Sequence, residues 1–96
     1  MKEEETSPKS DRDRMRKQLN ETHKWPCEFM FKFVVPNANE NEAALRAIFG
    51  IKARLSFRES KTGKYRSFTI KCQVENADEV FSKYEAAAKI PGIISL

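Results

Sequence analysis

The sequence predicts an α+β fold in which a four-stranded antiparallel sheet carries two helices on one face. Three observations lead to this fold class. Apolar and polar residues alternate along three segments, residues 27–35, 51–58 and 65–74. Two segments of helical spacing separate or follow these strands, at about residues 39–49 and 76–88. The length of 96 residues leaves room for one hydrophobic core only.

The first strand is predicted to start after Trp25-Pro26, because proline restricts the residue before it to an extended conformation. Its odd-numbered positions are apolar: Cys27, Phe29, Phe31, Phe33 and Val35. A period of two is typical of a strand that packs on one face. We therefore expect the odd-numbered side chains to face the core.

Each helix is predicted to begin at an asparagine that is followed three residues later by a glutamate, the pattern of a capping box. Asn39 and Glu42 mark the first helix, and Asn76 and Glu79 mark the second. Apolar residues at spacings of three and four follow both signals. Gly50 is expected to end the first helix with a positive φ.

The stretch from Arg58 to Ser67 combines a turn signal with the densest positive charge in the chain. Between Lys52 and Lys71 there are seven basic residues and one acidic residue, a net charge of +6. In the strand before it, the residues expected to face inward are Ile51, Ala53, Leu55 and Phe57. In the strand after it, they are Phe68, Ile70, Cys72 and Val74.

The apolar positions are thus odd in the second strand and even in the third. Paired residue numbers must then add up to an odd number, so the hairpin loop holds two or four residues. Thr62-Gly63 and Ser60 to Gly63 both fit this requirement.

Pro91-Gly92 is expected to stop the second helix, and Ile93 to Leu96 to form a short edge strand. The order is then strand, helix, strand, strand, helix, strand, the split βαβ or ferredoxin-like pattern. Right-handed crossovers give the strand order 4-1-3-2 with both helices on one face. The ferredoxin-like domain is expected to span residues 25–96.

Residues 1–24 contain seven basic and six acidic side chains and few apolar ones. Such a segment cannot bury enough surface to fold alone. We interpret it as a mobile charged tail, with a short helix from about Asp11 to Glu21.

Several classes of function find no support in the residues. His23 lies alone in the polar tail and there is no CxxC motif, so no metal or other cofactor is expected. Neither cysteine has a base at a recognisable spacing and no carboxylate pair faces the open side of the sheet, which argues against an enzyme. Cys27 and Cys72 are expected to be free thiols. No apolar run could span a bilayer and the acidic start is unlike a signal peptide, so we expect a cytoplasmic protein with no membrane contact.

The sheet face away from the helices is expected to be basic, with scattered apolar side chains such as Met30 and Val34. This mixture is typical of a surface that binds a partner, although alternating Lys and Arg can also simply protect an exposed sheet from aggregation. The candidate binding residues are Lys32, Arg54, Arg58, Lys61, Lys64, Tyr65, Arg66, Ser67 and Lys71.

Three features of the chain resemble the YbeD-like family, small bacterial proteins of uncharacterised function. They are Trp25-Pro26 before an aromatic strand, the hairpin with Ser60-Lys61, Gly63-Lys64-Tyr65, Ser67 and Thr69, and Tyr84 followed by Ile90-Pro91-Gly92-Ile93-Ile94. The resemblance covers about residues 24–96 and implies a ferredoxin-like fold similar to the ACT regulatory domain. The chain departs from the family at Pro36-Asn37, where the family tends to have glycine.

The sequence therefore favours a non-enzymatic regulatory or interaction module that binds an acidic protein partner or a small anionic ligand. In this interpretation the basic side chains of the hairpin supply charge, and Tyr65 and Ser67 orient the ligand through their hydroxyls. The alternative is weak RNA binding through the basic face and hairpin, since only Tyr65 is available for stacking on bases. The sequence leaves the identity of the partner open, and a homodimer is compatible with it.

Overall fold

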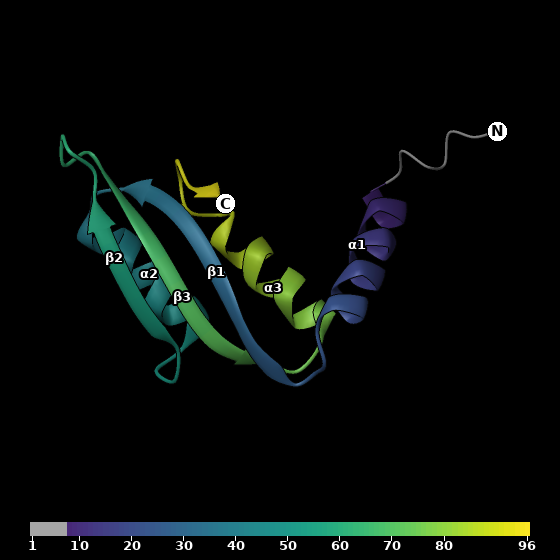
Figure 1. Cartoon of the computed structure of the whole chain (residues 1–96). Helices are drawn as coiled ribbons and strands as arrows, with labels where there is room; N and C mark the ends of the chain where they lie inside the picture. Colours follow the sequence, from purple (N-terminus) through teal and green to yellow (C-terminus); the bar gives the residue numbers. More distant parts are fainter. Residues whose placement is uncertain (1–7) are drawn as a thin grey trace.

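The computed structural model describes residues 8–96, with side chains from Asp11 onward, and it has the predicted α+β fold. Residues 1–7 of the predicted tail lie outside the described residues. The elements are α1 (Pro8–Thr22), β1 (Cys27–Pro36), α2 (Asn39–Phe49), β2 (Arg54–Glu59), β3 (Tyr65–Val74), α3 (Ala77–Ala87) and β4 (Ile94–Ser95). The strands form one antiparallel sheet in the predicted order, β2-β3-β1-β4, and α2 and α3 cover one face of it (Figure 1).

The register of the sheet agrees with the alternation in the sequence. β1 pairs with β3 over ten residues, from Cys27 with Val74 to Pro36 with Tyr65. Paired residue numbers add up to an odd number in this ladder and also between β2 and β3. The even length of the hairpin loop is thereby confirmed.

The hairpin closes where the Ser60 N–H donates to the Tyr65 carbonyl oxygen at 2.9 Å. The loop is therefore the four residues from Lys61 to Lys64. It starts one residue later than the Ser60 to Gly63 loop considered from the sequence. Gly63 has a φ of +76°, which a glycine adopts without steric cost.

The core lies between the sheet and the two covering helices. Phe31 and Phe33 of β1 are fully buried, and the Phe31 ring packs edge-on against Phe49 of α2 with centroids 4.8 Å apart. Edge-to-face aromatic pairs of this kind add to the free energy gained from burial itself. Tyr84 of α3 lies 5.1 Å from the Phe31 ring and so joins both helices to the central strand.

The predicted second strand begins too early. Residues 51–53 form a turn, in which the Ala53 N–H donates to the Gly50 carbonyl oxygen at 3.2 Å, and β2 starts only at Arg54. Ile51 is exposed, so its expected inward position is wrong, and Lys52 lies outside the sheet. The chain needs three residues to reverse its direction after α2, and the apolar alternation had assigned these residues to the strand.

One of the two predicted capping residues, Asn76, caps its helix, and the return bond from Glu79 lies one residue earlier than in a standard capping box. At α3 the Glu79 N–H donates to Asn76 Oδ1 at 2.9 Å, while the Glu79 carboxylate accepts the Glu75 N–H at 2.7 Å. At α2 the helix starts with Asn39 itself, and Ala38 occupies the cap position without a side-chain bond. The nearby Asn41 instead donates its side-chain amide to the Pro36 carbonyl oxygen, which ties α2 to the end of β1.

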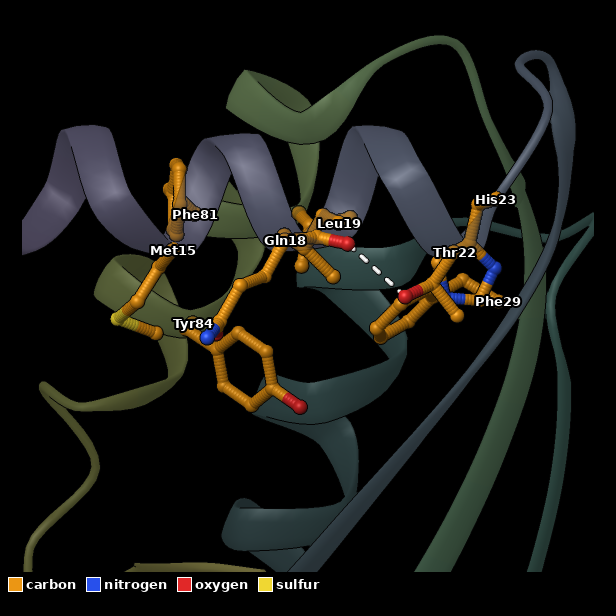
Figure 2. A pocket seen from close by; sticks show the side chains of 9 residues that line it. Met15, Gln18, Leu19, Thr22, His23, Phe29, Phe81 and Tyr84 are labelled. Atoms are coloured by element: carbon orange, nitrogen blue, oxygen red, sulfur yellow. Dashed lines mark hydrogen bonds between the residues drawn. The ribbon is translucent and has the colours of Figure 1, made fainter.

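The helix predicted within the tail is present and longer than expected. α1 lies beside α3, away from the sheet (Figure 1). Its apolar side chains, Met15 and Leu19, line a space shared with Phe81 and Tyr84 of α3 (Figure 2). The mobility of the segment stays a prediction, as does the domain boundary near residue 24.

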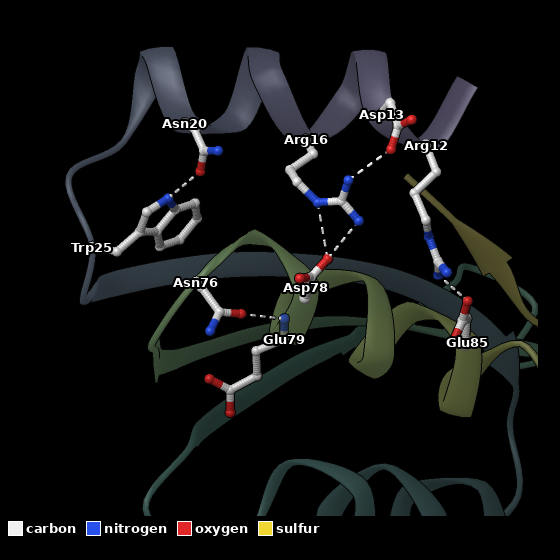
Figure 3. Close-up of polar contacts among 9 residues, drawn as sticks. All are labelled: Arg12, Asp13, Arg16, Asn20, Trp25, Asn76, Asp78, Glu79 and Glu85. Atoms are coloured by element: carbon white, nitrogen blue, oxygen red, sulfur yellow. Dashed lines mark hydrogen bonds and ion pairs between the residues drawn. The ribbon is translucent and has the colours of Figure 1, made fainter. Parts of the chain in front are cut away.

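Polar contacts hold the same two helices together (Figure 3). Arg12 pairs with Glu85 and lies 5.0 Å from the centre of the Phe81 ring. Arg16 donates to Asp78 at 2.8 Å, and this hydrogen bond raises the pKa of the guanidinium. Exposed ion pairs contribute little each, so the docking of α1 depends on several weak contacts.

The two cysteines are free thiols, as predicted. Cys27 is half-buried and Cys72 is buried, and both lie on the helix-covered face. Cys72 pairs with Phe29 in the ladder, whereas Cys27 pairs with Val74. The cysteines are therefore diagonal neighbours rather than a facing pair, a spacing at which the side chains of an antiparallel ladder lie too far apart for a disulfide.

Burial of Cys72 and Tyr84 predicts a loss of stability at alkaline pH. Loss of hydration raises the pKa of the Cys72 thiol above its ordinary value of 9.0 and that of the Tyr84 phenol above 10.0. The unfolded chain therefore ionises first, so the contribution is fully present below about pH 9 and is lost as pH rises through the folded-state values. Urea denaturation at pH 8, 9 and 10 should show falling unfolding free energy, with a smaller fall in Cys72→Ala. An identical fall in the variant would contradict the assignment to Cys72.

A second prediction concerns the contact between β4 and the end of β1. Gly92 has a φ of +79°, and a Cβ there would lie 2.9 Å from Cγ of Pro36. Gly63 has a similar φ but open space around it. Gly63→Ala should lose about 1 kcal/mol of unfolding free energy for backbone strain, and Gly92→Ala about 1–3 kcal/mol more for the clash. If urea denaturation gave the same loss of unfolding free energy for both variants, the Pro36 ring would have moved away from the added Cβ without cost.

Candidate binding site on the open sheet face

The sheet face opposite α2 and α3, called the open face below, carries the candidate residues in rows across the strands. Arg58, Ser67 and Val34 are paired in one row, which Ile94 of β4 extends. Ser56, Thr69 and Lys32 form the next row. The third row holds Arg54, Lys71 and Met30.

A depression of about 490 Å³ lies at the middle of this face. It is lined by Lys32, Ser56, Phe57, Arg58, Ser67 and Thr69. Two positive charges from β1 and β2 thus flank three hydroxyl groups. Hydroxyl donors and cations around one hollow form a set that suits an anion, because charge-assisted hydrogen bonds are stronger than neutral ones.

A smaller depression of about 240 Å³ continues toward the other end of β2. Arg54 and Lys71 line it together with Leu55, Ser56 and Thr69. Arg54 pairs with Glu28 at 2.5 Å across the sheet, which offsets part of the positive charge at this end.

Most of the candidate cations form no ion pair within the described side chains. Within residues 11–96, no ion pair is formed by any of Lys32, Arg58, Lys61, Lys64 and Lys71. All five side chains are exposed. Their charge is therefore available to an incoming anion, subject to screening by salt.

Lys61 and Lys64 lie in the hairpin loop, which Asn37 holds in place. The Asn37 side-chain amide donates to the Gly63 carbonyl oxygen at 2.7 Å, and its backbone N–H donates to the Lys64 carbonyl oxygen at 2.8 Å. The two lysines are thus presented on a fixed loop rather than on a free one. From the sequence, Asn37 was visible only as the end of the first strand.

Tyr65 stands at the base of the loop on the open face, opposite Pro36 in the ladder. It is about half exposed, and Ser67 lies two residues further along on the same face. Both hydroxyls therefore lie on the side where a ligand would approach. The Ser67 hydroxyl lies next to Lys32 and Arg58 in the central depression.

Arg66 lies on the opposite face from the other candidates. It shares the even parity of Phe68, and its side chain is only 14% exposed. Its guanidinium pairs with Glu42 of α2 at 2.9 Å and lies 4.7 Å from the centre of the Phe57 ring. Arg66 therefore joins the sheet to α2 and does not contribute to the open face.

Apolar side chains border the basic part of the open face along β1 and β4. Besides the predicted Met30 and Val34, they include Ile94, which is paired with Val34, and Leu96, whose N–H donates to the Lys32 carbonyl oxygen at 2.9 Å. Ile94 and Leu96 are more than half exposed. Their place on this face was not predicted from the sequence, and it follows from the pairing of β4 with β1.

None of the helices in residues 8–96 is long and apolar enough to cross a membrane. Over the same part of the chain, no group of three or more His, Cys, Asp or Glu side chains is arranged to hold a metal ion.

Comparison with known families gives one match over most of the chain. A family model described as "Protein of unknown function (DUF493)" matches residues 20–96. The chain belongs to this family. The match confirms the YbeD-like resemblance, and the DUF493 segment includes every strand and both helices that cover the sheet.

A solved structure supports the fold of the DUF493 segment. Protein HP0495 from H. pylori, known from a solution structure, is 18% identical and superposes with a TM-score of 0.61. The similarity covers 77% of this chain and 85% of that protein. At this level of identity it shows a common fold only. No curated protein gives a significant match.

The different surroundings of Arg66 and Arg58 predict different effects on stability. Arg66→Ala should lower the unfolding free energy by about 1–3 kcal/mol, because it removes charge-assisted bonds from a half-buried position. Arg58→Ala, at an exposed position, should change it by less than about 0.5 kcal/mol. Urea denaturation of both variants checks this, and equal small changes would show that Arg66 does not hold α2 to the sheet.

Proposed function

We propose that this chain is a non-enzymatic regulatory or interaction module that binds an acidic protein segment or a small anionic ligand on its open face. The observation that carries the proposal is the central depression, where Lys32 and Arg58 flank the hydroxyls of Ser56, Ser67 and Thr69. Neither cation is paired with an acidic side chain in residues 11–96. An anion would gain charge-assisted hydrogen bonds there without first breaking an ion pair.

The surroundings of the depression favour an acidic protein segment that also carries apolar side chains. Met30, Ile94 and Leu96 lie along one side of the open face and stay exposed. Lys61 and Lys64 add charge at the end of the hairpin. Against a complementary partner, such a surface can bury its apolar area and pair its positive charges with acidic side chains.

The non-enzymatic part of the proposal is supported by the chemistry of the open face. Its described side chains include one carboxylate, Glu28, which is paired with Arg54 away from the central depression. His23, Cys27 and Cys72 lie elsewhere, so among the described residues no imidazole, thiol or carboxylate lies next to the hydroxyls to act as a general base. We further propose a cytoplasmic location, in keeping with two free thiols.

RNA binding is the weaker candidate. Recognition of single-stranded RNA by a sheet surface depends on aromatic rings that stack on bases. Tyr65 is the aromatic residue that β1, β2 and β3 present on the open face, and it stands at the end of the sheet. The remaining attraction would be that of the basic charge, which depends strongly on salt.

Charge reversal on the open face tests the proposal. In NMR titrations with inorganic phosphate and with a deca-glutamate peptide, amide shifts should concentrate on β1, β2, β3 and the hairpin. Lys32→Glu with Arg58→Glu should weaken both interactions at least tenfold, because two contacts become repulsive. Lys61→Glu with Lys64→Glu should weaken the peptide more than phosphate.

The matched control reverses Lys24 and Lys89, two exposed lysines away from the open face, and should change affinity less than twofold. An equal loss of affinity in this control would show that the effect depends on net charge alone and would contradict the proposal. A uridine decamer that binds more tightly than the peptide at both low and high salt would favour RNA instead.

A further inference from the structure

A third hollow lies on the helix side of the molecule, remote from the open face. This cavity of about 460 Å³ lies between α1, α3 and the start of β1 and is open to solvent (Figure 2). Its apolar walls are formed by Met15, Leu19, Phe29, Val80, Phe81 and Tyr84. Its size falls in the range of small-molecule sites, which are concave and mostly apolar with a few polar groups.

Aromatic rings dominate these walls. Phe29 and Tyr84 both contact the buried Phe31 ring, at centroid distances of 4.8 and 5.1 Å, yet each is only partly buried because the cavity lies over it. Phe81 adds a third ring from α3. Rings arranged in this way can pack against a flat aromatic molecule in offset or edge-to-face geometry.

Besides the Tyr84 hydroxyl, the polar groups of the wall come from the end of α1 and from His23 just after it. The Thr22 hydroxyl donates to the Gln18 carbonyl oxygen at 2.9 Å and is therefore engaged. The Gln18 side-chain amide forms no hydrogen bond with any residue from 11 to 96, and in Figure 2 it points toward the Tyr84 ring. His23 is held by ring contacts with Trp25 and Phe29, at 5.3 and 5.2 Å. A ligand with one hydrogen-bond acceptor could use the Gln18 amide.

Part of the α1 wall of the cavity lies outside the segment shared with the family. The family match begins at residue 20, whereas Met15, Gln18 and Leu19 precede it. Arg12 and Arg16 keep this helix against α3 through Glu85 and Asp78 (Figure 3). The cavity is thus completed by an extension of this chain, so its occupant need not be common to the family.

We propose that this cavity binds a flat, uncharged aromatic molecule of about two fused rings that carries one hydrogen-bond acceptor. The rings would lie between Phe29, Phe81 and Tyr84, and the acceptor would face Gln18. Because it lies on the other side of the sheet, this site is independent of the anion site proposed on the open face.

A titration with 2-naphthamide, followed by NMR amide shifts, tests the site. This probe is uncharged, so the basic open face does not attract it. Shifts should concentrate on α1, α3 and the start of β1 and should saturate. Cyclohexanecarboxamide, which has the same acceptor but no aromatic ring, should bind at least fivefold more weakly.

Two variants of one exposed residue distinguish binding in the cavity from non-specific binding elsewhere on the protein. Gln18→Phe places a ring in the cavity and should weaken 2-naphthamide at least tenfold, while Gln18→Leu removes the amide donor and should weaken it about threefold. Lys17→Phe, the same change at an exposed neighbour that does not line the cavity, should alter affinity less than twofold. Both positions are exposed on α1, so unchanged circular dichroism is enough to show that the three variants are folded.

The proposal is overturned if 2-naphthamide gives no saturable shifts, or if Gln18→Phe binds it as well as the unaltered chain does. It is also overturned if the shifts fall on the open face. Phosphate and the deca-glutamate peptide should bind Gln18→Phe unchanged, so failure of this site and failure of the anion site give different results.

Discussion

The pairing of β1 with β3 over ten residues is the constraint on which the rest of the structure depends. Once Cys27 stands opposite Val74, each later pair is fixed, and with it the face of every side chain in both strands. Phe31 and Phe33 then meet the helices, while Lys32 and Thr69 meet solvent. A slip of one residue would exchange the two faces, burying lysines and exposing phenylalanines.

Most of the fold could be predicted because its strands alternate so regularly. The helix-covered face and the even length of the hairpin loop follow from that alternation, whereas the strand order follows from the right-handed crossovers between the elements. The failures are local. Ile51 continues the apolar alternation of β2 in the sequence, but in the structure it belongs to the turn after α2. Asn39 matches the capping pattern, but it forms no cap, and Asn41 instead holds the start of α2 through its bond to Pro36. Short-range hydrogen bonds decided both positions.

The candidate site was predictable in part for the same reason. The alternation of faces along the strands placed Lys32, Arg58 and Ser67 together on the open face. The same alternation places Arg66 on the helix-covered face, although it had been included among the binding residues because it lies near the hairpin. The exposed positions of Ile94 and Leu96 depend on the pairing of a two-residue strand, too short to show a period. The aromatic cavity depends on where α1 docks against α3, and a helical pattern says nothing about the partner that a helix chooses.

The two bonds from Asn37 to the hairpin loop carry a consequence for how the loop can vary in length. Adding or deleting two residues keeps every strand side chain on its own face, so the sheet tolerates it. The same change moves the carbonyl groups of Gly63 and Lys64 away from Asn37. Related chains with a longer or shorter loop should therefore have lost the need for asparagine at this position, so that the two features vary together.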